Sequence, residues 1–255
     1  MGCVGVPPQT PLKDVFEKTP LRIPKNFSKR VIYYFTVMKL LFQGDSITDG
    51  NRYRDPAKRW DLNHQIGHSY VYMIAGRLMA EFPLKYEIVN RGISGNTVAD
   101  LEKRWDEDAL EIAPDLLSIL VGTNDSHRQV PDGLTLTEWY ESGYRRILDR
   151  SLEKNPDLKL VILEPFTLKY ASYKSETDDE YKARRERFIG VQDAAKRIAA
   201  DYSATFIELQ PTFDSLVTDA VPSTYWIWDG IHPTEAGQWV IAEKWLSAVK
   251  PLLNL

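Results

Sequence analysis

Five short apolar runs alternate with helical patterns along most of the chain, and this alternation constrains the fold more than any other feature. The expected strands are Met38–Gln43, Tyr86–Asn90, Leu116–Val121, Leu158–Leu163 and Thr205–Leu209. The expected helices, with apolar residues at helical spacing, lie at residues 71–82, 97–112, 137–153, 180–200 and 234–249. Strands that alternate with helices predict right-handed parallel crossovers. The sequence therefore predicts α/β architecture: a single-domain, three-layer α/β/α sandwich around a five-stranded parallel sheet, which is doubly wound and flavodoxin-like.

The residues before the first expected strand differ in composition from the rest of the chain. Residues 1–30 contain five prolines and mixed charges, which favours an extended arm over a packed element. We therefore expect residues 1–37 to form an N-terminal extension and residues 38–255 to form the folded domain.

The overall composition excludes several classes of protein. Of the 255 residues, 43% are hydrophobic and 27% are charged, as in ordinary globular proteins. The net charge of −4 gives no general attraction to phosphate backbones, and no apolar run reaches the roughly 20 residues that a membrane helix needs. We expect no nucleic-acid partner, no membrane association and, without an export signal, a cytoplasmic location. The sequence leaves open whether the chain forms a homo-oligomer.

Polar residues follow the ends of the expected strands. Ser46 comes after the first strand, Gly95 after the second and Asn124 after the third. Sites in doubly wound proteins form at the edge where the carboxyl ends of the parallel strands meet. Asp229 and His232 lie between the fifth strand and the last helix, so their loop can fold back over the same edge.

Ser46, His232 and Asp229 are the three groups that a serine hydrolase requires. A serine hydroxyl is a poor nucleophile until an imidazole accepts its proton and a carboxylate holds that imidazole in the right tautomer. Two residues separate Asp229 from His232, which lets both side chains project from one turn. A structural role is also open for some of these residues, because serine is a preferred helix cap and Asn124 lies in a typical turn sequence.

Four short blocks resemble, in order, the sequence blocks of the SGNH (GDSL-type) hydrolases. They are GDSIT at 44–48, NRGISGNT at 90–97, GTND at 122–125 and DGIHP at 229–233. The resemblance implies the SGNH hydrolase fold, with Ser46 as nucleophile, His232 as general base and Asp229 as the group that orients the imidazole. It also implies an oxyanion hole formed by the backbone N–H groups of Ser46 and Gly95 and the side-chain amide of Asn124.

The surrounding residues favour a short acyl group on a carbohydrate. Trp226 and Trp228 precede Asp229, and aromatic faces beside a catalytic loop are natural platforms for sugar rings. His127, just after the GTND block, is a further candidate substrate-binding residue. The connection from Phe166 to Tyr181 is polar, unlike the groove that a long acyl chain needs. The chain also resembles intracellular bacterial esterases that deacetylate xylo-oligosaccharides, which implies an acetylated sugar or another short-chain ester as the small-molecule substrate.

Two other functions stay open at this point. A lysophospholipase or thioesterase of the same superfamily would use the same three groups, and a non-catalytic carbohydrate-binding protein could share the fold. His64 and His68 are four residues apart, but no cysteine or glutamate motif completes a metal shell. We therefore expect neither a metal nor another cofactor, and we expect Asp45 and Asp125 to hold turns.

Overall fold

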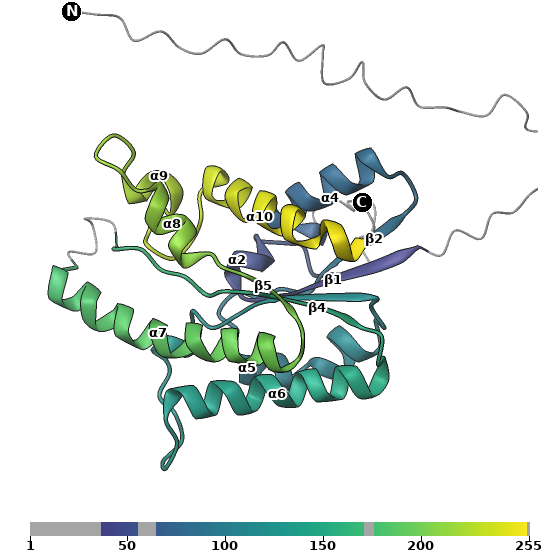
Figure 1. The fold of residues 1–255 in the computed structure, drawn as a ribbon, viewed down its shortest axis with the longest axis horizontal. Helices are drawn as coiled ribbons and strands as arrows, with labels where there is room; N and C mark the ends of the chain where they lie inside the picture. The colour runs from purple at the N-terminus through teal and green to yellow at the C-terminus, as the bar shows by residue number, and fades with distance from the viewer. Residues whose placement is uncertain (1–36, 56–64, 171–175, 254–255) are drawn as a thin grey trace, which may run out of the picture. The chain divides into compact units, whose positions relative to one another are not determined.

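The computed structural model describes residues 37–55, 65–170 and 176–253, which contain one five-stranded sheet (Figure 1). Its strands are β1 (Met38–Gly44), β2 (Tyr86–Asn90), β3 (Leu116–Leu120), β4 (Lys159–Leu163) and β5 (Thr205–Ile207). Every neighbouring pair is parallel, in the order β2-β1-β3-β4-β5. This order is the flavodoxin-like one, so the predicted fold class is confirmed. The predicted N-terminal extension lies outside the described residues, apart from Val37, and its boundary stays a prediction.

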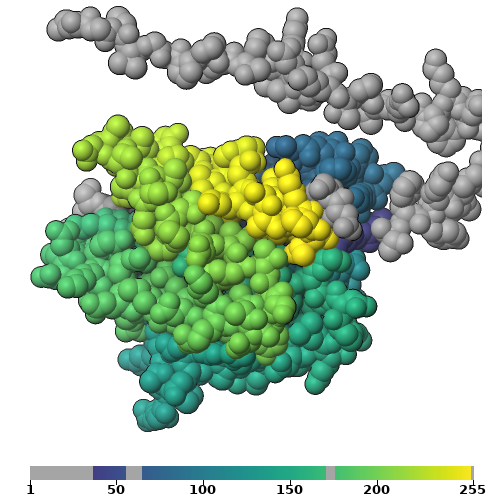
Figure 2. Space-filling model, in the orientation of Figure 1, coloured from purple at the N-terminus to yellow at the C-terminus, as the bar shows by residue number. Residues whose placement is uncertain are grey.

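Helices cover both faces of the sheet, as the alternation of strands and helices predicts (Figure 1). The helices that form the outer layers are α4 (Tyr70–Glu81), α5 (Val98–Lys103), α6 (Leu136–Lys154), α7 (Asp178–Asp201) and α10 (Glu235–Leu253). The other helical segments are α2 (Ser46–Asp49), η2 (Asp106–Leu110), η3 (Asp125–His127), α8 (Gln210–Leu216) and α9 (Ser223–Trp226). Helices α4 and α10 share one face, where Figure 2 shows them side by side, and α5, α6 and α7 cover the other. In the described ranges, no helix is long and apolar enough to cross a membrane.

Alternate residues of the strands fill two cores, one on each face of the sheet. Leu40 and Phe42 of β1 belong to the core beneath α4 and α10, whereas Leu41 belongs to the core of α5, α6 and α7. Side chains alternate across a strand, so a strand that is covered on both faces is apolar throughout. The buried indole N–H of Trp245 donates to the Ser118 hydroxyl at 2.9 Å, which satisfies this polar pair within the first core.

The helix expected over residues 97–112 is not continuous. It begins with the predicted capping box between Thr97 and Asp100, but α5 ends after six residues and the chain continues as η2, a π-helical turn. In this turn the Asp108 carbonyl accepts a hydrogen bond from the buried Gln43 amide at 2.6 Å. This tertiary contact with β1 competes with the regular helical ladder, and apolar spacing alone does not reveal it.

Strand β5 is shorter than predicted, and two short helices follow it. The prediction ran to Leu209, but the Glu164 carboxylate accepts the backbone N–H groups of Leu209 and Gln210, both at 2.8 Å. These donors are therefore lost to the sheet, and α8 begins at Gln210. The sequence does not predict α8 and α9, because such short helices give no clear periodicity.

Candidate active site

Ser46 is the first residue of α2 and follows β1 at the carboxyl edge of the sheet. The turn between the two elements is tight, because a Cβ on Gly44 would lie 2.3 Å from the Leu120 carbonyl oxygen. Asp45 caps α2, since its Oδ1 accepts the Ile47 N–H at 3.0 Å. The strand end and the cap together fix the backbone at Ser46, and Asp45 holds this turn as predicted.

The Ser46 hydroxyl, the His232 ring and the Asp229 carboxylate form one hydrogen-bonded chain. Ser46 Oγ lies 2.9 Å from His232 Nε2, and His232 Nδ1 lies 2.8 Å from Asp229 Oδ2. Asp229 Oδ1 accepts the backbone N–H groups of Ile231 and His232, at 3.0 and 2.7 Å. Burial alone would raise the pKa of Asp229, but these hydrogen bonds outweigh it and lower the pKa to about 2. Asp229 is therefore ionised at neutral pH and can accept Nδ1–H, and in this tautomer the Nε2 lone pair faces the Ser46 hydroxyl and can accept its proton.

Backbone contacts hold the loop that carries the imidazole and its carboxylate. The Trp228 N–H donates to the His232 carbonyl at 3.0 Å. Gly230 has a φ of +89°, and a Cβ there would lie 2.7 Å from the Leu168 carbonyl oxygen. The chain can therefore turn between these contacts only with glycine at this position, and the tight turn brings the two side chains together.

Gly95 and Asn124 lie in the neighbouring loops, after β2 and β3. Gly95 has a φ of +82°, with open space where a Cβ would stand. Asn124 Nδ2 lies 3.1 Å from the Asn96 carbonyl oxygen and 3.3 Å from Asp45 Oδ2. The Asn124 amide thus connects the loop that contains Gly95 to the turn that carries Ser46.

Asp45 and Asp125 are buried carboxyl groups beside this network. Asp125 Oδ1 accepts the Val98 N–H at 3.0 Å, at the start of α5. Burial raises the pKa of Asp45 to about 6 and the pKa of Asp125 to about 7, against smaller opposing effects of backbone N–H groups. Their contacts are those of groups that hold neighbouring turns in place, as the sequence predicts.

A hollow of about 420 Å³ opens at Ser46, a size that suits a small-molecule ligand. Its lining consists of Ser46, Ile47, Asp49, Gly50, Asn51, Arg54, His68, Ser94, Trp228, His232, Pro233 and Gln238. Most of these side chains are polar. The buried Asp49 carboxylate accepts the Ser94 N–H at 2.9 Å and the Arg54 guanidinium at 2.5 Å. Asp49 therefore ties one wall of the hollow to the loop that contains Gly95.

Comparison with known proteins identifies the family. Residues 42–240 match the model of the GDSL-like Lipase/Acylhydrolase family. An acetylxylan esterase of Geobacillus stearothermophilus is 33% identical over 218 residues, which cover 83% of this chain and 93% of that protein. The chain belongs to the GDSL-like lipase/acylhydrolase family.

Solved structures agree with this assignment. A protein of Parabacteroides merdae described as a GDSL-like lipase is 36% identical, with a TM-score of 0.73 over 83% of this chain and 94% of that one. The crystal structure of an acetylxylan esterase from Geobacillus stearothermophilus is 31% identical, with a TM-score of 0.64 and the same coverage. This acylhydrolase is thus a carboxylic ester hydrolase with the SGNH fold, and the resemblance drawn from its sequence blocks is confirmed.

Only one of the two tryptophans beside Asp229 lines the hollow of this acylhydrolase. Trp228 is 51% exposed, and its ring is stacked on the His232 ring with centroids 6.0 Å apart. Trp226 instead donates its indole N–H to the Leu216 carbonyl at 3.0 Å and packs against the core beneath α10. The structure therefore gives Trp226 a packing role, and its predicted contact with substrate receives no support.

His127 lies in the lining of a different hollow, of about 850 Å³, whose walls come from the loop after η3 and from α6 and α7. Its Nδ1 lies 2.9 Å from the Thr123 carbonyl oxygen, and its Nε2 lies 3.4 Å from the Tyr170 hydroxyl. The structure does not bring His127 together with Ser46 in one hollow, so a contact with the acyl group is not supported.

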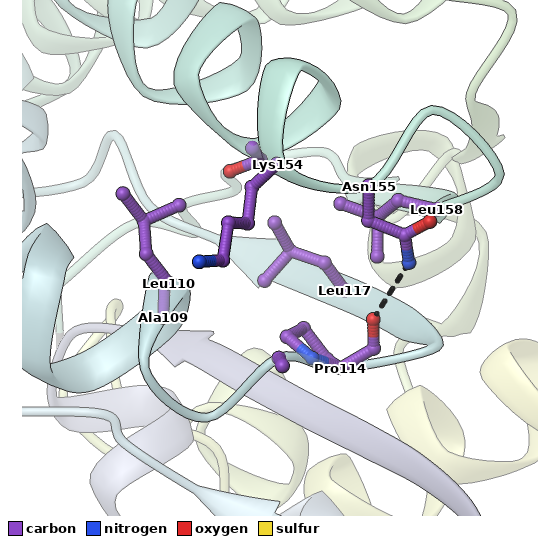
Figure 3. Close-up of a pocket in the computed structure, with 9 residues that line it drawn as sticks. Ala109, Leu110, Pro114, Leu117, Lys154, Asn155 and Leu158 are labelled. Carbon is purple, nitrogen blue, oxygen red and sulfur yellow. Dashed lines mark hydrogen bonds between the residues drawn. The ribbon is translucent and has the colours of Figure 1, made fainter.

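A smaller cavity of about 220 Å³ lies at the opposite, amino edge of the sheet (Figure 3). Its walls are mainly apolar, with Leu110, Leu117 and Leu158 around it and Lys154 pointing toward Leu110. Its described lining contains no histidine and no carboxylate. This cavity therefore lacks the imidazole and the carboxylate of a hydrolase site, and the length of the sheet separates it from Ser46.

The metal pair weighed from the sequence is only partly within the described residues. His68 lines the hollow at Ser46, whereas His64 lies outside the described ranges. Within those ranges, no group of three or more His, Cys, Asp or Glu side chains is arranged to hold a metal ion.

No sequence motif predicts Asp49, Arg54 or Gln238 as residues of the site. All three line the hollow, but none belongs to a motif with its own chemical signature. Asp49 directly follows the GDSIT block, and that position was the one signal that could have drawn attention to it.

Proposed function

We propose that this chain is a carbohydrate acetylesterase that removes acetyl groups from xylo-oligosaccharides or other acetylated sugars. The observation that carries the proposal is the hydrogen-bonded chain from Ser46 through His232 to Asp229, with 2.9 Å between Oγ and Nε2. The nature of the acyl group and of the alcohol is supported by the acetylxylan esterase of Geobacillus stearothermophilus, which is also described as an acetyl-xylooligosaccharide esterase.

The proposed reaction proceeds through an acyl-serine intermediate. Ser46 Oγ attacks the ester carbonyl carbon while His232 Nε2 takes the hydroxyl proton, and Asp229 stabilises the imidazolium through Nδ1–H. The tetrahedral intermediate collapses when His232 returns this proton to the sugar oxygen, which leaves as an alcohol. Water then attacks the acetyl group with the same proton transfers, which releases acetate and restores the Ser46 hydroxyl.

The developing oxyanion would be held by the backbone N–H groups of Ser46 and Gly95 and by the Asn124 amide. In the unliganded site, Asn124 Nδ2 has acceptors in Asn96 and, at the longer distance of 3.3 Å, in Asp45. The contact to Asp45 is the longer and therefore the weaker of the two, and an oxyanion is a strong hydrogen-bond acceptor. We therefore expect the oxyanion to replace the weaker contact to Asp45, while the Asn96 carbonyl keeps the amide oriented.

The composition of the hollow favours a sugar over a long acyl chain. Arg54 and Gln238 offer hydrogen-bond donors, Asp49 and Asn51 offer polar groups, and Trp228 offers an aromatic face. Apolar side chains make up a minority of the described lining, so a lysophospholipase or thioesterase with a long acyl channel is not favoured. The intact hydrogen-bonded chain likewise argues against a carbohydrate-binding protein without activity.

Hydrolysis of p-nitrophenyl acetate, butyrate and octanoate, measured beside acetate release from acetylated xylo-oligosaccharides, tests this proposal. Wild type should prefer acetate among the model esters and should release acetate from the sugars. Ser46→Ala should lose both activities while it keeps the wild-type melting temperature. A preference for octanoate would move the assignment to lipid or thioester hydrolysis, and sugar binding without turnover would support a binding protein.

A further inference from the structure

A second hollow, of about 310 Å³, continues from the first along the start of α10. Its lining consists of His68, Trp228, Pro233, Thr234, Glu235 and Gln238. Four of these residues, His68, Trp228, Pro233 and Gln238, also line the hollow at Ser46. The two hollows therefore share a wall, and each is within the size range of a small-molecule site. Space for a ligand therefore extends from the hollow at Ser46 toward Thr234 and Glu235.

Gln238 places a fixed hydrogen-bond donor in the shared wall. Its side chain is buried, with 9% of the residue exposed, and its Oε1 accepts the Tyr70 N–H at 2.8 Å. Because a backbone N–H can only donate, this bond fixes which end of the amide faces α4. Within residues 37–55, 65–170 and 176–253, no group accepts a hydrogen bond from Nε2. A rigid amide N–H with no protein acceptor is suited to a ligand oxygen.

Trp228 and Glu235 add the other two groups that a sugar ring uses. The Trp228 indole is half-exposed and lies nearly parallel to the His232 ring, at 23°, so it offers a flat apolar surface beside the catalytic imidazole. Glu235, in the first turn of α10, is exposed and contributes a carboxylate that can accept two hydroxyl hydrogen bonds. An aromatic face, an amide donor and a carboxylate acceptor thus surround one small hollow.

We propose that this second hollow binds a neighbouring sugar residue of an oligosaccharide whose acetylated residue occupies the hollow at Ser46. The inference rests on the proposed function and extends it, because it makes the natural substrate a chain of at least two sugars. Gln238 Nε2 donates to a ring or hydroxyl oxygen of the second sugar, Trp228 stacks on its face, and Glu235 accepts from its hydroxyl groups.

The test is the dependence of kcat/KM on substrate length, measured with acetylated xylose, xylobiose and xylotriose and with p-nitrophenyl acetate. Wild type should gain about tenfold in kcat/KM from xylose to xylobiose, as expected for two or more added contacts, and little from xylobiose to xylotriose. Gln238→Glu keeps an acceptor for the Tyr70 N–H but removes the donor. This variant should retain the wild-type melting temperature. Its gain in kcat/KM from acetylated xylose to acetylated xylobiose should be about fivefold smaller than that of wild type.

A matched pair of tryptophans separates a groove contact from a general surface effect. Trp228 and Trp239 are 51% and 50% exposed, but only Trp228 lines the two hollows. Trp228→Ala should reduce the ratio of xylobiose to xylose kcat/KM. Trp239→Ala should leave this ratio and the hydrolysis of p-nitrophenyl acetate unchanged.

The outcomes distinguish the subsite from the proposed function. Equal kcat/KM for acetylated xylose and xylobiose would overturn the subsite and leave the acetylesterase intact. A gain with length that survives both Gln238→Glu and Trp228→Ala would overturn its assignment to this hollow. Hydrolysis of p-nitrophenyl acetate without acetate release from any of the sugars would contradict the proposed function itself.

Discussion

Replacing Asp229 by asparagine should nearly abolish turnover while the fold is retained. In wild type, Asp229 Oδ1 accepts two backbone N–H groups, and Oδ2 accepts from His232 Nδ1. An asparagine can keep its oxygen on the two backbone donors, but its NH₂ group then faces Nδ1. The imidazole must accept there, its proton moves to Nε2, and Nε2 can no longer accept the Ser46 proton.

The size of the effect follows from the alternative orientation of the amide. If the introduced asparagine amide flipped, its oxygen would accept Nδ1–H, but its NH₂ group would then face the backbone N–H groups of Ile231 and His232. Losing both hydrogen bonds costs about 1–3 kcal/mol each, so about 2–6 kcal/mol favours the inactive tautomer. This corresponds to a fall in kcat of at least about 30-fold, and the general cost of this exchange in a Ser-His-Asp triad is about 10⁴-fold.

The assay is kcat for p-nitrophenyl acetate, with the melting temperature as a check on folding and Asp229→Ala as a comparison. Asp229→Asn should keep a melting temperature near that of wild type, whereas Asp229→Ala should be less stable because it loses every hydrogen bond of the carboxylate. A folded Asp229→Asn variant that retains more than a tenth of the wild-type kcat would refute the tautomer argument.

Three further changes test separate parts of the structure. Asn124→Ala should lower kcat for p-nitrophenyl acetate by about 10²–10³-fold if the amide stabilises the oxyanion, and a loss of less than tenfold would assign Asn124 to the turn alone. Burial raises the pKa of Asp125 from 3.8 to about 7, so its ionisation destabilises the fold as pH rises from about 4 to about 7. Asp125→Asn should therefore raise the melting temperature relative to wild type more at pH 8 than at pH 4, by about 8–16 °C, and equal differences at the two pH values would contradict this. Gly230→Ala places a Cβ 2.7 Å from the Leu168 carbonyl at a φ of +89° and should cost at least about 1 kcal/mol in the free energy of unfolding by urea; an unchanged midpoint would show that the loop relaxes.

The sheet could be predicted from the sequence because its central strands are buried on both faces. Leu116–Leu120 is fully buried, and such a strand gives a continuous apolar run. The prediction was wrong where a distant side chain decides the local structure. Glu164 ends β5 by binding two backbone N–H groups, and Gln43 binds the Asp108 carbonyl within the π-helical turn. Neither contact leaves a periodic signal in the chain.

The sequence motifs predict Ser46, Asp229 and His232, but they do not predict which other side chains line the hollow at Ser46. Trp226 and Trp228 cannot be distinguished from the sequence, because both are aromatic residues just before Asp229. In the structure, Trp226 ends α9 and packs against the core, while Trp228 lies in the following loop and lines the hollow. Gln238 is one polar residue on a long helix, and only its bond to the Tyr70 N–H distinguishes it. The cytoplasmic location leaves no such contact in a single chain and stays a prediction, and the oligomeric state stays open.

Covalent labelling of the nucleophile tests the central claim most directly. A fluorophosphonate reacts far faster with an activated serine than with other serines, and tryptic cleavage after Lys39 and Arg52 would release a peptide, residues 40–52, in which Ser46 is the one serine. Mass spectrometry should find a single adduct on this peptide, in parallel with loss of esterase activity, and none on Ser46→Ala. Loss of activity with the adduct at another residue, or an unlabelled residue 46 in the inactivated protein, would contradict the assignment of Ser46 as the nucleophile.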